Sequence, residues 1–265
     1  MMKVKFIAIL LALPIVQAVG QGITRLPDGD YSGVGPDEVI VTGSRIDITT
    51  TNDANEPVHI EDEYVLKESS GIPFLQLNHS PRRFVVLWSK EFLFLNEIGG
   101  DIKMECDKSM GKQIEFLDSA KSYASNGFLT EGTVSYAPAN LSLRKGIWGN
   151  PFVPSREVGW RKSTLRLTWY TGFGLKTFIV VSNGFVSADQ PYLYRANARA
   201  KGISIYLDGA NAAQKFELED TPNPQILPLP IGFKEATIRV DTVYHGERWD
   251  DLCLNFILAG LGALK

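Results

Sequence analysis

The stretch SNGFVSADQPYLYRANARAKGISIYLDG, Ser182 to Gly209, decides the fold class that this sequence predicts. It opens with the tight-turn pair Asn183-Gly184 and crosses a polar segment that carries two tyrosines and two arginines. Its end alternates Ile203, Ile205 and Leu207 with polar or amphipathic residues, which is the period of two that a half-buried strand requires. The stretch therefore predicts a turn, a long loop and a strand.

The same pattern recurs on both sides of this stretch. Alternating strands are expected at 165–169, 216–219 and 236–241, and the apolar run Phe178–Val181 predicts a strand that is covered on both faces. Helix signals are nearly absent after residue 119. Short strands at regular spacing with turn residues between them are typical of a β-sandwich, so residues 119–265 are predicted to form one.

Upstream of the sandwich, the apolar runs between Tyr64 and Met104 predict a small antiparallel β-unit over residues 58–118, with a hairpin that turns at Ser89-Lys90. Residues 21–57 are rich in Gly, Asp, Thr and Asn, and they are expected to be extended or disordered apart from a β-prone island at Glu38–Ile46. Within the island, Val39–Arg45 resembles the start of the plug of TonB-dependent receptors, which hints at a Gram-negative source.

Residues 1–20 have the features of a signal peptide: early lysines, the apolar run Phe6–Val16 and the small-residue end Ala18-Val19-Gly20. The run is shorter than the ~20 residues of a transmembrane helix. No cysteine follows it, so a lipid anchor is not expected, and no later run is long enough to cross a bilayer. The sequence therefore predicts an exported protein, periplasmic or secreted, whose mature chain begins near Val19 or Gln21.

Composition excludes some classes of partner. The formal net charge is −3 with no long block of one sign, which argues against a nucleic-acid partner because that binding needs a concentrated basic face. The glycine pairs at 172–174 and 260–262 lack the context of phosphate loops, and no cofactor is predicted.

Cys106 and Cys253 leave two alternatives open, a disulfide or buried small hydrophobes; neither has a second cysteine or histidine at metal-ligand spacing.

The block from Tyr136 to Phe256 resembles the discoidin-like, galactose-binding-fold module named after the NAD glycohydrolase translocation domain. The residues that carry the resemblance are Tyr136–Leu141, Ser182–Phe185, Tyr194, Asn197, Arg199, Lys201, Val243–Gly246 and Asp250–Leu254. The resemblance implies a jelly-roll sandwich and a binding role, and it does not imply the glycohydrolase reaction.

Two departures from the family pattern matter. Ser142-Leu143 replaces the usual Asp-Gly pair, and Asn255-Phe256 replaces the closing Ser-Glu. In discoidin-type folds the first of these regions borders a cation or ligand rim, so the loss of its acidic residue puts metal and glycan binding there in doubt.

A sugar site needs flat aromatic faces and a few fixed polar groups. The residues in or near predicted loops that could form its rim are Trp148, Tyr192, Tyr194, Asn197, Arg199, Trp249 and Asp250. The alternative interpretation is that the aromatic residues are core plugs and that Arg199 pairs with Asp250 or Asp251 to hold two loops together.

The polar turn His245–Asp251 does not by itself predict catalysis, because turns select such residues and catalysis requires groups that converge on one pocket. The sequence thus favours a non-enzymatic protein that recognises carbohydrate or a cell-envelope component. The alternative is a structural or protein-interaction module that docks another exported protein.

Overall fold

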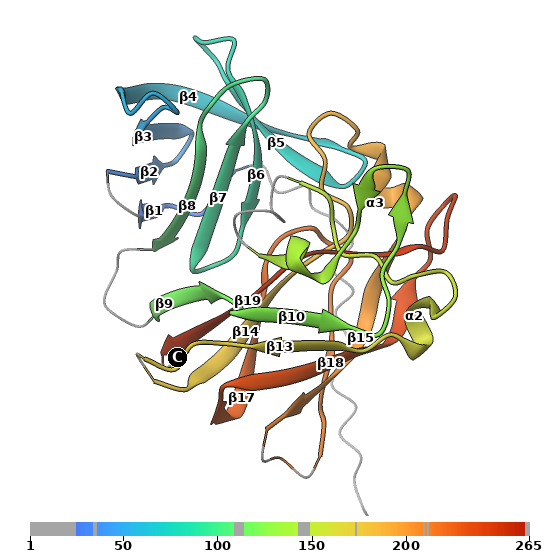
Figure 1. Ribbon diagram of the computed structural model, residues 1–265. Coiled ribbons are helices and arrows are strands. Elements are labelled where there is room, and N and C mark those ends of the chain that lie inside the picture. The colour runs from blue at the N-terminus through green and yellow to red at the C-terminus, as the bar shows by residue number, and fades with distance from the viewer. Residues whose placement is uncertain are drawn as a thin grey trace, which may run out of the picture.

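A computed structural model describes residues 25–33, 36–108, 114–142, 149–172, 174–208, 210 and 212–262. The described chain is all-β: a closed eight-stranded antiparallel barrel is followed by a mixed β-sheet region (Figure 1). The all-β class predicted from the sequence is confirmed. The predicted signal peptide, residues 1–20, lies outside the described residues.

The barrel strands pair in chain order, and the last strand returns to the first. Closure of this kind leaves no unpaired sheet edge. The hairpin predicted around Ser89-Lys90 is confirmed, since Trp88 lies opposite Leu93. The strands are β1 (Gly29–Ser32), β2 (Glu38–Thr42), β3 (Arg45–Thr51), β4 (Pro57–Ser69), β5 (Ile72–Leu77), β6 (Arg83–Trp88), β7 (Phe92–Glu97) and β8 (Lys103–Lys108).

The expected boundary at residue 58 falls inside this barrel. The described part of 21–57 is not disordered, because it supplies β1, β2 and β3. Val39 and Val41 point into the barrel interior, as do Ile46 and Ile48 of the next strand, while the residues between them are more exposed. Gly43, one of the glycines that suggested disorder, lies in the tight turn between β2 and β3, where its φ of 62° favours glycine.

Strands β6 and β7 are apolar on both faces because each face meets a different core. Phe84 and Val86 point into the barrel with Leu93. Val85 and Leu87 point outward and pack against the sheet region. This double burial explains why the sequence shows continuous apolar runs here instead of alternation.

The described sheet region contains nine strands in one sheet, ordered β10-β13-β18-β15-β19-β14-β17, with β16 paired to β15 and β9 to β19. The pairs are antiparallel except β15 with β19, which is parallel. The strands are β9 (Ile114–Ser119), β10 (Ser122–Ser125), β13 (Leu165–Thr168), β14 (Lys176–Asn183), β15 (Ala198–Leu207), β16 (Gln214–Glu217), β17 (Gln225–Phe233), β18 (Glu235–Tyr244) and β19 (Leu252–Gly262). Short elements lie between them: the hairpin β11 (Thr130–Glu131) and β12 (Val134–Ser135), the 3-10 helix η1 (Pro138–Leu141), and helices α2 (Gly159–Lys162) and α3 (Tyr192–Ala196).

Strand β14 is buried on both faces, as predicted for Phe178–Val181. Ile179 and Val181 belong to the core shared with β13, β15 and β18. Phe178 and Val180 belong to the core shared with β6 and β7 of the barrel. In that second core the rings of Phe94 and Phe256 lie 5.3 Å apart, so barrel and sheet are joined by a common apolar layer.

Of the two alternatives left open for the cysteines, the disulfide is not formed: Cys106 and Cys253 are both free and buried. Cys106 belongs to the barrel core, whereas Cys253 lies on β19 of the sheet. Burial raises the pKa of the Cys106 thiol to about 12, and burial also raises the pKa of the Cys253 thiol. The buried-hydrophobe alternative therefore describes both residues.

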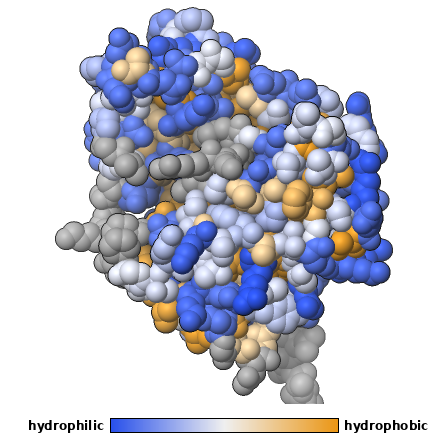
Figure 2. Space-filling view, in the orientation of Figure 1, coloured by the Kyte–Doolittle hydropathy of each residue, from blue (hydrophilic) through white to orange (hydrophobic). Residues whose placement is uncertain are grey.

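On the face shown in Figure 2, hydrophilic residues cover most of the barrel, and hydrophobic residues appear only in small groups. Within the described chain, no helix combines the length and the apolar character that crossing a membrane would take.

Candidate ligand-binding site

The turn 245–250 packs against the end of α3. The backbone N–H of Glu247 donates to the carbonyl of Arg195 at 3.0 Å, and that of Trp249 donates to Ala196 at 2.9 Å. Gly246 permits this approach, because a Cβ atom there would overlap the carbonyl oxygens of Trp249 and Ala196. Trp249 is therefore held beside α3 while its side chain stays 43% exposed.

Trp249 borders a cavity of about 240 Å³, which we call the tryptophan hollow. Its apolar walls come from four separate parts of the chain, and its polar groups include two carboxylates, one guanidinium and one amide. The side chains that line it include Trp249, Tyr136, Phe185 and Leu193, with Glu131, Arg156, Asn197 and Asp251.

Arg156 fixes the polar side of the tryptophan hollow. Its guanidinium lies 3.5 Å from a carboxylate oxygen of Asp251 and 2.8 Å from a carboxylate oxygen of Glu131. The hydrogen bond to Asp251 is the largest cause that raises the pKa of Arg156, and the charges of both carboxylates raise this pKa further. Exposed pairs of this kind add little stability. They do bring three polar side chains together at one side of the cavity, which gives a sugar hydroxyl several donors and acceptors within reach.

Tyr136 supplies an aromatic face with a polar tip. Its ring packs edge-on against Phe185, with centroids 6.4 Å apart. Burial raises the pKa of its phenol, and the negative charges of Glu131 and Asp251 add to the effect. The hydroxyl therefore keeps its proton at neutral pH and is able to donate a hydrogen bond.

Two of the predicted rim residues, Asn197 and Trp249, line the tryptophan hollow. The Asn197 amide donates to the carbonyl of Leu193 at 2.9 Å, which closes the end of α3. Tyr192 is exposed on α3 and does not line this cavity; the guanidinium of Arg248 lies 5.5 Å from the centre of its ring.

Tyr194 and Arg199 are interior residues, only 0% and 4% exposed, so they cannot form a rim. The predicted pairing of Arg199 with Asp250 or Asp251 is wrong. Its partner is Asp220, reached by Nε at 2.7 Å and by a terminal nitrogen at 3.0 Å. The Tyr194 hydroxyl donates to the same carboxylate at 3.3 Å. Tyr194, Arg199 and Asp220 together form an anchor that holds α3 in place. The core-plug alternative expected such an interior role for Tyr194.

Asp250 does not line the cavity. Asp250 is exposed, and its carboxylate lies 3.0 Å from Nδ1 of His245, which is exposed as well. Trp148 lies outside the described residues. Within the described part of the chain, no three His, Cys, Asp or Glu side chains gather to hold a metal ion.

Sequence reasoning missed Glu131, Arg156 and Asp251 as a group. Only Asp251 stood in a segment that had drawn attention, and Arg156 lies in a stretch with no recognisable pattern. Their association depends on β11, the segment before α2 and the start of β19 meeting in space, which no local signal encodes.

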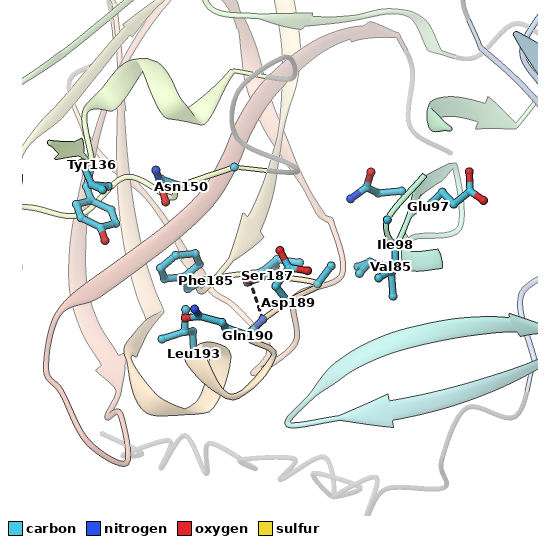
Figure 3. Close-up of a pocket in the computed structure, with 16 residues that line it drawn as sticks. Val85, Glu97, Ile98, Tyr136, Asn150, Phe185, Ser187, Asp189, Gln190 and Leu193 are labelled. Carbon is cyan, nitrogen blue, oxygen red and sulfur yellow. Dashed lines mark hydrogen bonds between the residues drawn. The ribbon is translucent and has the colours of Figure 1, made fainter. Parts of the chain in front are cut away.

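A second, larger cavity of about 480 Å³ lies where the barrel meets the segment 185–193, and we call it the junction cleft (Figure 3). Figure 3 shows Val85, Glu97 and Ile98 of the barrel on one side and Tyr136 and Phe185 on the other. Further lining residues are Asn96, Gly99, Asn150, Ser187, Asp189, Gln190 and Leu193.

No family model matches the chain, and no curated protein matches it. Among solved structures, one match is "The structure of CBM51-2 in complex with GlcNAc and INT domains from Clostridium perfringens ZmpB". The match has 12% sequence identity and a TM-score of 0.26; it covers 82% of this chain and 44% of that chain. The similarity is distant, so the argument about function depends on the site itself.

Proposed function

We propose that this protein is an exported, non-enzymatic carbohydrate-binding protein and that the tryptophan hollow is its binding site. The observation that carries the proposal is the presence, in one cavity, of the partly exposed Trp249 and the ion-paired group of Arg156, Glu131 and Asp251. An aromatic face covers the apolar side of a sugar ring, while fixed donors and acceptors bind its hydroxyls.

The proposal includes a finer description of the fold, in which the sheet region is a jelly-roll sandwich of the galactose-binding type. The composition of its core supports this. Leu165 of β13, next to one end of the sheet order, shares one apolar cluster with Leu227 of β17 at the other end. Strands from opposite ends of the order thus contribute to the same interior, as two packed layers would.

Glycan-array screening of the mature chain, followed by calorimetric titration of the best glycan, tests the binding site. Trp249→Ala should weaken binding about 30-fold, the effect of losing an aromatic hot spot worth roughly 2 kcal/mol. Tyr170→Ala is the matched control, because Tyr170 is an aromatic residue with 64% exposure that does not line the hollow. Its affinity should equal that of the parent.

Two outcomes would overturn the proposal. If Trp249→Ala binds the glycan within twofold of the parent, the binding site is elsewhere. If no glycan binds at millimolar concentration, the protein-interaction alternative is favoured. Export is tested separately by cell fractionation and by sequencing the N-terminus, which should begin near Val19 or Gln21.

A further inference from the structure

We propose, building on the carbohydrate-binding function above, that the barrel completes the site, so that the ligand is a neutral oligosaccharide that extends from the tryptophan hollow across the junction cleft. The recognition site then belongs to both parts of the molecule. In this arrangement the barrel contributes specificity for chain length.

The two cavities adjoin. Tyr136, Phe185 and Leu193 line both of them, so the junction cleft begins where the tryptophan hollow ends. The edge-to-face pair of Tyr136 and Phe185 forms the shared wall. A ligand that lies over this aromatic pair contacts Trp249 at one end and the barrel at the other.

The sizes of the cavities favour more than one sugar unit. Small-molecule sites typically measure about 300–1,000 Å³. The tryptophan hollow, at about 240 Å³, falls below that range, whereas the junction cleft, at about 480 Å³, lies within it. The hollow thus suits one terminal unit, and the cleft offers the larger volume for the units that follow.

Asn96 gives the barrel side a polar group that suits a hydroxyl. Phe92 and Phe94 of β7 face outward toward the sheet region, and Asn96, two residues further on, shares their side of the strand. Its Oδ1 atom is buried and has no hydrogen-bond partner among the described residues. An unsatisfied buried acceptor destabilises the free protein, and a ligand hydroxyl would satisfy it once the amide turns toward the cleft that Asn96 lines.

The charges around the cleft select against acidic sugars. Glu97 and Asp189 are the charged residues among the described lining positions, and both are carboxylates. In the tryptophan hollow, Glu131 and Asp251 outnumber the one cation, Arg156. A uronate or sialic acid would meet an excess of carboxylates over cations among the lining side chains, so uncharged glycans should be preferred.

Calorimetric titration with sugars of increasing length tests the inference. The probes are galactose, glucose and N-acetylglucosamine, the di- and trisaccharides built from each, and oligogalacturonates as acidic counterparts. For the sugar that binds, affinity should rise at least tenfold from one unit to three, and the acidic oligomers should bind at least tenfold more weakly than the neutral ones.

Variants assign the gain to the barrel. Asn96→Ala should lower affinity for the trisaccharide about five- to tenfold, the effect of one lost hydrogen bond, and leave the monosaccharide unchanged. Asn78→Ala is the control, an exposed barrel asparagine outside both cavities, and should change neither. Asp189→Asn, at an exposed position where the fold is not at risk, should improve binding of the acidic oligomers.

The outcomes separate the two proposals. If affinity does not rise with length and Asn96→Ala has no effect, while Trp249→Ala still weakens binding about 30-fold, the extension onto the barrel is refuted and the sugar site stands. If Trp249→Ala has no effect or no sugar binds, the sugar site fails and the extension fails with it. Tighter binding of the acidic oligomers would refute the assignment of a neutral ligand.

Discussion

The contact between Phe94 of the barrel and Phe256 of the sheet should be energetically coupled, because it lies in the apolar layer that joins the two parts. The ring centroids are 5.3 Å apart at an interplanar angle of 52°, and both side chains are almost fully buried. Aromatic pairs in such tilted arrangements contribute about 0.5–1.5 kcal/mol beyond the area they bury. The junction cleft exists only if this layer holds the barrel in place.

A double-mutant cycle measures this coupling. Replacement of either phenylalanine by alanine would lower the free energy of unfolding by about 3–5 kcal/mol. Two such losses are comparable to the whole stability of a typical domain, roughly 5–15 kcal/mol. Leucine keeps most of the volume and removes the ring, so Phe94→Leu and Phe256→Leu should each lower the free energy of unfolding by about 1–2 kcal/mol. The free energy of unfolding of the double variant should fall by about 0.5–1.5 kcal/mol less than the sum of the two single-variant losses.

Urea denaturation followed by tryptophan fluorescence gives the free energies, since the chain has five tryptophans. The control cycle combines Phe94→Leu with Phe233→Leu. Phe233 belongs to the other core, where its ring lies 5.5 Å from that of Trp169. This second pair should be additive within about 0.3–0.5 kcal/mol. Additivity of Phe94 with Phe256, or separate unfolding of barrel and sheet, would refute the reasoning.

Other predictions concern the Arg199–Asp220 anchor, the two buried thiols and Gly184. Burial alone would raise the pKa of Asp220, but the hydrogen bond and charge of Arg199, together with the charge of Arg195, lower this pKa. The ionised carboxylate therefore stabilises the fold above the unfolded pKa of about 3.9, and this stabilisation is lost as pH falls through the folded pKa. Asp220→Asn should therefore flatten the acid limb of unfolding free energy against pH, and an unchanged limb would contradict this. Cys106 and Cys253 should resist a thiol reagent in the native protein and both react in guanidinium; a reductant-sensitive mobility shift would instead show a disulfide. Gly184→Ala should lower the free energy of unfolding by at least about 1–3 kcal/mol, because φ is +81° and the new Cβ would lie 2.5 Å from the Tyr194 ring; an unchanged urea midpoint would refute it.

The sequence was informative wherever a local rule applied. Alternation at 203–207 and the apolar run at Phe178–Val181 located strands, and a two-residue turn signal located the hairpin at Ser89-Lys90. The same rules underestimated residues before 57, because a Gly- and Thr-rich composition resembles disorder when each strand is short. In the described part of this segment, β1, β2 and β3 are ordered by their pairing with neighbouring strands of the barrel.

The candidate site was only partly predictable. Trp249 and Asn197 were found because aromatic and amide residues in loops are a recognisable signal. Tyr194 and Arg199 carried the same signal but face inward, and sequence cannot separate the two cases without knowledge of what covers the loop.

By itself, the sequence determined the all-β class, the position of most strands and the double burial of β14, because these depend on side-chain period and turn chemistry between near neighbours. Only the tertiary structure decided that β8 returns to β1, that Arg199 pairs with Asp220, and that Arg156 meets Glu131 and Asp251. The alternation of apolar and polar residues along a strand indicates which face of the strand is buried. It carries no information about which distant segment packs against that face.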